Sequence, residues 1–293
     1  MRIINTYSIV AYDPTDDAWG VAVASKFLAA GAVVSWARAG AGAVATQSYA
    51  NVTFGNNGLA LMESGKTAQE TLDQLIAEDE NRNKRQVGMV DKFGNSASYT
   101  GSECHAWAGH KLGEGFACQG NILTGANTLD AMADTFIHTK GELADRLTAA
   151  LLAGDTIGGD SRGKQSAGVL VVKANAGYGG NNDRYLDLRV DDDPEPVRKL
   201  AILVNTHHLY FGSPKPEDAM PITEDIAREL QWMMVQGGYF GGEINGVWDE
   251  MSQLAFSNLV GNENLEERWS KEKSPAMIDK VALGYLRNRL GKK

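Results

Sequence analysis

The chain opens with two strand-like segments separated by a short acidic turn. Residues 6–13 read TYSIVAYD and residues 19–26 read WGVAVASK, and both favour strands because they are rich in Val, Ala, Tyr and Ile. The pattern predicts a hairpin at the start of the fold, with Thr6 as the first residue of its first strand. A hydroxyl residue in that place is a candidate nucleophile, because a free α-amine on the same residue can act as its base.

Composition is that of a soluble globular chain and narrows the classes of partner. The 293 residues are 43% hydrophobic, and the mean hydropathy is -0.28. No apolar run approaches the roughly 20 residues that a membrane helix needs. The net charge is -9 with no basic stripe, which argues against nucleic acid as a partner. The first residues lack the apolar stretch of a secretory signal, so we expect a cytoplasmic protein without a membrane partner.

The cysteines and histidines predict neither a disulfide framework nor a metal site. Two cysteines, Cys104 and Cys118, are too few to staple a chain of this length. Together with His105 and His110 they match no zinc pattern, because paired Cys-x-x-Cys arms are absent. Asp191 to Asp193 precede Pro194 and are interpreted as a helix N-terminus with proline at its first position. We therefore expect no metal and no cofactor.

The first two hundred residues alternate strand-like and helical patterns. Helical spacing over residues 57–79 includes Thr67, placed as an N-cap three residues before Glu70. The segment 86–100 predicts a hairpin around its Gly-Asn turn. The other segments are strands over 32–38, 43–47, 166–173 and 184–190, and helices over 128–152 and 197–209. Helices lying against sheets of hairpins predict an α+β fold, arranged as a layered sandwich.

A change in composition and residue pattern near residue 212 predicts a second domain. Residues 212–217 read GSPKPE, and their two prolines interrupt any helix. The following 75 or so residues are helical in pattern and carry Trp232, Trp248 and Trp269. We expect one domain over residues 1–212 and a small helical domain over 218–293.

Several stretches in order resemble the bacterial family called domain of unknown function 1028. They are residues 8–11, 20–25, 36–47, 107–110, 119–121 and 159–167, and the resemblance covers roughly residues 6–210. The family is assigned to the N-terminal nucleophile (Ntn) hydrolase superfamily, so the resemblance implies a four-layer αββα sandwich. The tail at residues 230–249 is similar to a peptidoglycan-binding module. The family's substrate is not established.

This resemblance implies hydrolysis of a C–N amide bond in a small amide or peptide-like substrate. Thr6 Oγ would attack the carbonyl while the α-amine of Thr6 takes the proton. Lys26 and Arg38 are candidates for a cation that keeps the amine neutral. Ser25 would orient the amine, and Ser8 is the alternative nucleophile.

Further residues would bind the substrate or support the nucleophile. The turn at Gly40 to Gly42, or the amides of Gln47, Gln119 and Asn121, would hold the oxyanion. His110 belongs to the motif at 107–110 and is a candidate substrate contact. A motif like Asp160–Ser161, with the strand at Ser166, lies beside the nucleophile in proteasome-like relatives, so Asp160 and Ser166 are candidate supports.

The start of the chain also allows a rival interpretation. Met1 is followed by Arg2, whose size blocks removal of the initiator methionine, so exposure of Thr6 requires cleavage between Asn5 and Thr6. Without it, Thr6 and Ser8 are ordinary strand residues, and the protein is a catalytically silent binding or scaffolding protein.

The aromatic residues of the tail allow two roles. Tyr239, Phe240 and Trp248 either contact cell-wall fragments or pack a small helical core that mediates self-association into a homo-oligomer.

Overall fold

The computed structural model describes residues 6–212 and 214–291, and the chain divides after Val204 into two compact units. Each unit has its own hydrophobic core and is described by itself. Within the described residues, every helix is too short or too polar to cross a membrane.

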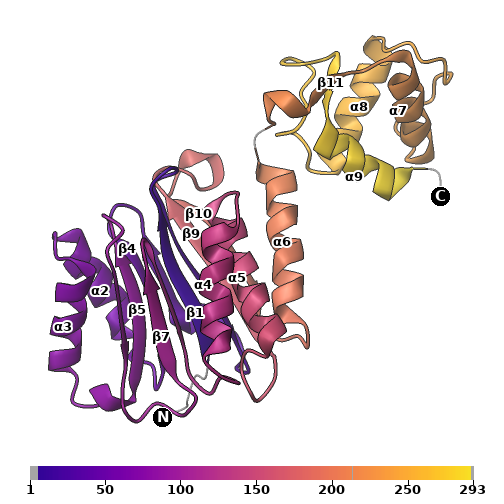
Figure 1. Ribbon diagram of the computed structural model, residues 1–293. Coiled ribbons are helices and arrows are strands. Elements are labelled where there is room, and N and C mark those ends of the chain that lie inside the picture. The colour runs from indigo at the N-terminus through magenta and orange to yellow at the C-terminus, as the bar shows by residue number, and fades with distance from the viewer. Residues whose placement is uncertain (1–5, 213, 292–293) are drawn as a thin grey trace. The chain divides into compact units, whose positions relative to one another are not determined.

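The N-terminal unit contains two antiparallel sheets that face each other (Figure 1). The six-stranded sheet has the order β10-β9-β2-β1-β8-β7 and the four-stranded sheet the order β3-β4-β5-β6. The first sheet comprises β1 (Thr6–Asp13), β2 (Ala18–Ser25), β7 (Gly109–Gly113), β8 (Phe116–Gly120), β9 (Ser166–Lys173) and β10 (Arg184–Val190). The second comprises β3 (Ser35–Arg38), β4 (Gly42–Ser48), β5 (Arg85–Asp91) and β6 (Ser96–Thr100).

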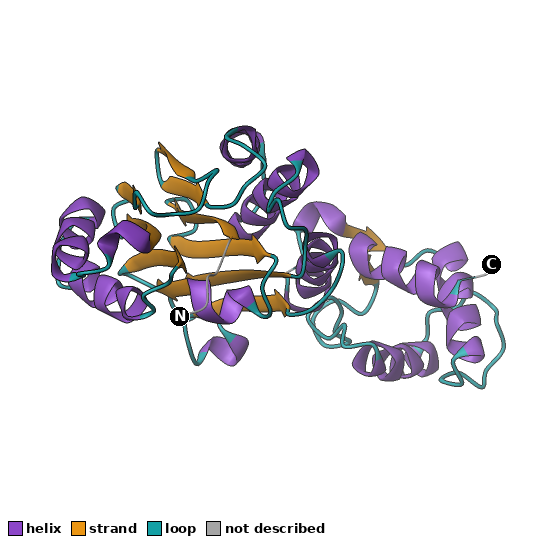
Figure 2. Ribbon diagram, turned by 90° about the horizontal axis from the view of Figure 1, so that it is seen from below, coloured by secondary structure: helices purple, strands orange, loops and turns teal. Residues whose placement is uncertain are grey.

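Helices cover the outer face of each sheet. Helices α2 (Thr53–Glu63) and α3 (Ala68–Glu78) pack on the four-stranded sheet. Helices α4 (Asn127–His138), α5 (Leu143–Ile157) and the first part of α6 (Pro196–Phe211) pack on the six-stranded sheet. The order helix, sheet, sheet, helix is visible in Figures 1 and 2. The α+β class and the four-layer αββα arrangement expected from the sequence are therefore confirmed.

The alternation of side chains along each strand separates an inner core from two outer cores. In β1, Ile9 packs toward the helices whereas Val10 packs between the sheets. In β5, Met89 packs on α2 and α3 whereas Val90 faces the six-stranded sheet. Even-numbered residues of β1 thus all face the space between the sheets, and Thr6 and Ser8 are among them.

Local sequence signals identified several elements correctly and misplaced others. Thr67 caps α3 in a reciprocal capping box with Glu70, as predicted. The helical stretch 57–79 is two helices, because Gly65 adopts φ 106° and breaks it. The stretch 128–152 is likewise broken at Gly141, with φ 119°.

Two boundaries also differ from the sequence-based expectation. The apolar run from residue 32 begins in a short helix, α1 (Ala30–Val34), instead of a strand. It is helical because Ala30 and Val34, four residues apart, both pack into the inner core. Helix α6 begins at Pro196 and not at Pro194. The side chain of Asp193 accepts the Glu195 N–H at 2.8 Å before the helix starts.

The C-terminal unit is a small helical domain with a two-stranded ribbon. It contains β11 (Ala219–Pro221), α7 (Glu224–Gln236), α8 (Glu250–Asn262), β12 (Met277–Asp279) and α9 (Lys280–Leu290), with the 3-10 turn η3 (Pro216–Asp218). Thr223, Asp249 and Asp279 cap its three α-helices with side-chain oxygens. Leu230, Met233, Phe256, Leu259 and Leu286 form its core with Trp269. The predicted linker 212–217 includes residue 213, which lies outside the described residues. Two further 3-10 turns, η1 (Arg82–Lys84) and η2 (Tyr178–Gly180), lie in the N-terminal unit.

The packing of α2 on the four-stranded sheet depends on a glycine. A Cβ on Gly55 would lie 2.1 Å from the Trp36 ring. We expect Gly55→Ala to lower the unfolding free energy by about 1–3 kcal/mol, because the ring must shift. Gly125→Ala is the matched control, since a Cβ on Gly125 meets nothing within 4 Å. Urea unfolding followed by tryptophan fluorescence measures both, and equal stability of the two variants would contradict this packing.

Candidate functional site

A row of hydroxyl residues crosses three adjacent strands at one end of the six-stranded sheet. Thr6 pairs with Ser25 and Ser25 pairs with Ser166, so all three side chains share the face between the sheets. Thr6 is fully buried, and its Oγ1 donates to Ser25 Oγ at 3.3 Å. Ser166 Oγ donates to the Phe27 carbonyl at 2.6 Å and accepts the Ala30 N–H at 3.0 Å. Ser166 therefore holds the start of α1, while Thr6 and Ser25 contact each other.

Four buried amide side chains lie beside this row, between the two sheets. We call them the amide cluster: Gln47, Gln86, Gln119 and Asn121. Gln86 Oε1 accepts hydrogen bonds from Gln47 Nε2 at 2.9 Å and from Asn121 Nδ2 at 2.8 Å. Since Gln47 and Gln86 belong to one sheet and Gln119 to the other, the cluster joins the two sheets.

The cluster also fixes the first strand. Ser8 Oγ donates to Gln47 Oε1 and accepts from Gln119 Nε2, both at 2.6 Å. The Thr6 carbonyl lies 3.3 Å from Gln47 Nε2 and accepts the Asn121 N–H at 3.0 Å. The Ser8 hydroxyl is thus held by one amide side chain from each sheet, and the Thr6 carbonyl is bound from both sheets.

Gln86 continues the network toward the edge strands. Its Nε2 lies within hydrogen-bond distance of the Gly120 carbonyl (2.8 Å), Thr100 Oγ1 (3.0 Å) and the Gly109 carbonyl (3.1 Å). Thr100 Oγ1 in turn lies 3.0 Å from His110 Nδ1. Burial lowers the pKa of the His110 imidazole, which favours its neutral form. A continuous polar path therefore links His110 to Thr6.

Two acceptors in the cluster have no hydrogen-bond partner among the described residues: Gln119 Oε1 and Asn121 Oδ1. Such atoms are rare in protein interiors because an unpaired buried polar group costs about 1–3 kcal/mol. Gly88 makes room for one of them, since a Cβ there would lie 1.9 Å from Gln119 Oε1. Gln119 Oε1 and Asn121 Oδ1 are therefore atoms of the amide cluster whose hydrogen-bonding capacity the described residues leave unused.

A second polar group lies next to Ser25, on the helix side of the sheet. Asp160 is 5% exposed and accepts the Lys26 N–H at 2.9 Å and the Arg162 guanidinium at 2.6 Å. Asp155 accepts from Tyr7 at 3.2 Å and from Lys164 at 2.6 Å. Burial, and then the Asp155 charge, raise the pKa of the Tyr7 phenol well above its usual value. A small pocket is lined by Tyr7, Asp155, Asp160 and Lys164 together with Ser25 and Gly163.

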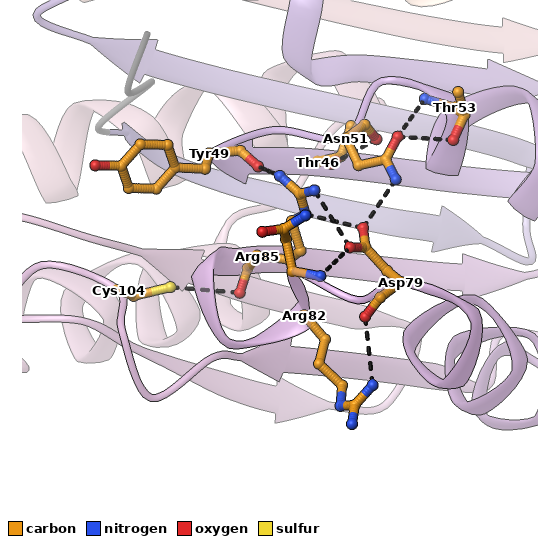
Figure 3. A network of polar contacts seen from close by, with 9 residues as sticks. Thr46, Tyr49, Asn51, Thr53, Asp79, Arg82, Arg85 and Cys104 are labelled. Carbon is orange, nitrogen blue, oxygen red and sulfur yellow. Dashed lines mark hydrogen bonds and ion pairs between the residues drawn. The ribbon is translucent and has the colours of Figure 1, made fainter. Parts of the chain in front are cut away.

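A buried ion pair supports the amide cluster where β5 begins (Figure 3). Arg85, next to Gln86, bonds Asp79 through Nε at 2.9 Å and the Tyr49 carbonyl through NH1 at 2.5 Å. Burial opposes ionisation of Asp79, but hydrogen bonds from Arg85 and Asn51 hold the pKa of its carboxyl below the usual range. Arg85 thereby ties the chain that leaves β4 to the start of β5.

Of the two predicted cations, Lys26 directly follows Ser25, the strand partner of Thr6, whereas Arg38 lies at the far end of its sheet. The Lys26 ammonium donates to the Lys164 carbonyl at 3.2 Å. Arg38 pairs with Gly42, the first residue of β4, whereas Gln47 lies near the other end of that strand. The Arg38 guanidinium bonds Glu63 at 2.5 Å. The turn at Gly40 to Gly42 lies at that far end as well. Cleavage between Asn5 and Thr6 remains a prediction, because Asn5 lies outside the described residues.

Of the three aromatic residues predicted as contacts in the C-terminal unit, Phe240 is buried in the helical core, and Tyr239 and Trp248 are half-buried against it. Trp248 Nε1 donates to the Pro275 carbonyl at 2.7 Å, and its ring meets Phe256 edge-on at 5.5 Å. Tyr239 packs on the same core. Gln231 holds the loop between α7 and α8, because its Oε1 accepts the Gly246 N–H and its Nε2 donates to the Val247 carbonyl, both at 2.9 Å.

Sequence reasoning missed the centre of the network. Gln86 is buried, and its side-chain amide has partners in Gln47, Asn121, Thr100 and two backbone carbonyls, whereas the sequence pattern indicates only that it lies in a hairpin strand. Strand alternation could have placed it: Gln86 lies an even number of residues from Gly88 and Val90, so its side chain faces the inner core as that of Val90 does. Arg85 and Asp79 were also missed, because their pairing depends on how the chain folds back.

Among the described residues, no group of three or more His, Cys, Asp or Glu side chains is arranged to hold a metal ion. Cys104 and Cys118 are free thiols. Cys118 is fully buried, and burial raises its thiol pKa.

Comparisons with known proteins agree with the two-part organisation. Residues 6–200 match the model "Family of unknown function (DUF1028)", and residues 210–286 match "Putative peptidoglycan binding domain". The crystal structure of protein SPO2555 from Silicibacter pomeroyi, described with the DUF1028 model, is similar with a TM-score of 0.64 and 29% identity. The match covers 70% of this chain and 86% of that one. No curated protein matches.

The amide cluster generates a stability prediction. Gln86→Leu should lower the unfolding free energy by about 3 kcal/mol or more. The side-chain amides of Gln47 and Asn121 lose a shared acceptor, and the buried Gly120 carbonyl and the part-buried Gly109 carbonyl lose a donor. Gln69→Leu, on the exposed face of α3, is the matched control and should change stability by less than about 0.5 kcal/mol. Chemical denaturation measures the difference, and similar values for both variants would refute the central role of Gln86.

Proposed function

The chain belongs to the DUF1028 family, and we propose that its N-terminal unit hydrolyses a C–N amide bond in a small amide or peptide-like substrate. Thr6 is the nucleophile, after cleavage of the Asn5–Thr6 bond. One observation carries this proposal: Thr6 heads β1, is fully buried between the sheets, and has its hydroxyl against Ser25 and its carbonyl clamped by Gln47 and Asn121.

The proposed reaction begins with the cleavage that creates the base. In the intact chain the nitrogen of Thr6 is part of a peptide bond and is not basic. Addition of water across the Asn5–Thr6 bond releases a free α-amine whose ordinary pKa is about 8. In so enclosed a place desolvation lowers that pKa and favours the neutral amine, so a neighbouring lysine or arginine is not needed.

Acyl transfer then follows in two balanced steps. Thr6 Oγ adds to the substrate carbonyl, its proton passes to the α-amine, and that proton goes on to the departing substrate nitrogen as the C–N bond breaks. Water then attacks the Thr6 ester and gives one proton to the α-amine. As the ester C–O bond breaks and the acid leaves, the α-amine passes that proton to Thr6 Oγ, which restores the hydroxyl and the neutral amine. Ser25 orients the hydroxyl and the amine throughout.

Substrate recognition is assigned to the amide cluster. Gln119 Oε1 and Asn121 Oδ1 are buried acceptors that suit the N–H groups of an amide or peptide. Amide donors of the same cluster would receive the negative charge that develops on the attacked carbonyl oxygen. Asp160 acts indirectly, because it fixes the backbone of Lys26 directly after Ser25.

The state of the N-terminus tests the hydrolase proposal. We expect intact mass and N-terminal sequencing of freshly purified protein to show loss of residues 1–5 and a chain that starts at Thr6. Thr6→Ala should remain uncleaved and should abolish amide hydrolysis in a screen of acyl-amino acid and dipeptide substrates. Ser8→Ala is the matched control for hydroxyl loss on the same face, and its folded fraction should retain cleavage. A wild-type chain that retains Met1 and hydrolyses nothing would instead favour a silent binding protein.

We propose in addition that the C-terminal unit binds peptidoglycan fragments. The match of residues 210–286 to a peptidoglycan-binding model supports this proposal. The loop between α7 and α8 supports it as well. Gln231 holds this loop in place, and the loop carries the half-buried rings of Tyr239 and Trp248. A preformed loop binds at a lower entropic cost than a flexible one.

Co-sedimentation with purified insoluble peptidoglycan tests this second role. The full chain should pellet in a saturable manner, and Tyr239→Ser should weaken binding about tenfold, as expected for an aromatic contact residue. Tyr178→Ser, at a tyrosine 85% exposed in the N-terminal unit, is the matched control and should bind like wild type. Wild-type protein that stays in the supernatant would refute the proposal.

A further inference from the structure

A second cavity opens in the N-terminal unit, along the side of the sandwich where β3 and β10 are the edge strands of the two sheets. Its volume is about 440 Å³, enough for a small molecule. Residues of α1, β3 and α2 form one wall, and residues of β9 and β10 form the other. We call this cavity the edge cleft.

The edge cleft is rich in arginine. Arg38 comes from β3, and Arg184 and Arg189 come from β10, whereas Asp187 is the single acidic residue in its lining. Asp187 pairs with both arginines of its own strand: its Oδ2 lies 3.4 Å from Arg184 NH1, and its Oδ1 lies 3.6 Å from Arg189 Nε. The lining therefore carries three positive charges and one negative charge, in a chain whose net charge is -9. Such a local reversal of sign attracts anions.

Two glycines set the position of Arg189. A Cβ on Gly31 would lie 3.2 Å from both Cγ and Cδ of Arg189, and a Cβ on Gly168 would lie 3.2 Å from Cγ. The aliphatic stem of Arg189 thus passes between α1 and β9, through a gap that larger residues would narrow. A guanidinium held in this way loses less side-chain entropy when it binds a ligand.

Existing ion pairs leave these arginines able to bind a ligand. The guanidinium side chains of Arg38, Arg184 and Arg189 are 40%, 66% and 42% exposed. Exposed ion pairs contribute little net free energy, so an anion with several oxygens can compete with Glu63 or Asp187. Trp36 and Asn56 supply an aromatic surface and an amide beside the charges. The Trp36 ring is fixed because its Nε1 donates to the Val33 carbonyl at 3.0 Å.

We propose that the edge cleft binds a small organic anion, with a carboxylate or phosphate group on Arg189 and Arg38 and its organic part against Trp36. Arginine forks match the oxygen geometry of both groups. The cavity accommodates a metabolite-sized molecule and not a folded partner. This proposal is independent of the hydrolase proposal. Arg38 pairs with Gly42 at the start of β4, far along that strand from Gln47, and the cleft lining includes neither Thr6 nor Ser25.

Isothermal titration calorimetry of the full chain tests the proposal with three named probes. Glycerol 3-phosphate and succinate carry the two anionic groups, and glycerol is the neutral control. We expect saturable binding of at least one anion, weakened by added sodium chloride, and none of glycerol. Comparison of the two anions shows whether phosphate or carboxylate is preferred.

Matched arginine variants locate the binding. Arg189→Gln should weaken binding of the better anion about tenfold or more. Arg184→Gln, at a more exposed position, provides a second cleft variant in case loss of Arg189 disturbs the fold. Arg198→Gln is the control, because Arg198 is exposed on α6, pairs with Glu195 and lies outside the cleft lining. Absence of saturable binding of both anions, or equal weakening by Arg198→Gln, would overturn the proposal. Neither result bears on cleavage before Thr6.

Discussion

The N-terminal unit depends on hydrogen bonds between amide side chains buried where its two sheets meet. Sheets that face each other usually pack through apolar side chains alone, and the two sheets of this unit pack in that way around Val10, Val21 and Val90. At one end, however, the amide cluster replaces apolar packing. Buried amides are tolerated only when nearly all of their hydrogen-bonding groups are paired, so they prescribe the distance and register of the two sheets more strictly than aliphatic side chains do.

The same requirement places the candidate nucleophile. Thr6 begins β1 on the face that the amide cluster occupies, and its carbonyl is part of the network. The Arg85–Asp79 ion pair fixes the start of β5 beside Gln86. Thr6 is therefore held by a rigid surrounding of strands and hydrogen bonds. Such a surrounding suits chemistry that needs positions held within a fraction of an ångström. The edge cleft is built differently, from exposed guanidinium groups.

Family membership and local structure were largely readable from the chain. The hairpin of β1 and β2, strands β9 and β10 and the capping box of α3 all have short-range signals, because alternation and capping involve residues close in sequence. The match to DUF1028 over residues 6–200 confirms the resemblance carried by those motifs. Helix breaks at Gly65 and Gly141 were missed, since helical spacing alone does not show where a glycine takes a positive φ.

The sequence by itself determined those strands whose alternation is clear, the first among them, and which of their residues share a face, because side chains alternate along a strand wherever it packs. It therefore placed Thr6 and Ser8 on one face at the head of the first strand. Only the tertiary structure decided which distant residues meet there. The fold places Gln86 in the amide cluster and Arg38 at the far end of the same sheet. Partners across two sheets depend on strand order and direction, and one sequence does not specify these locally.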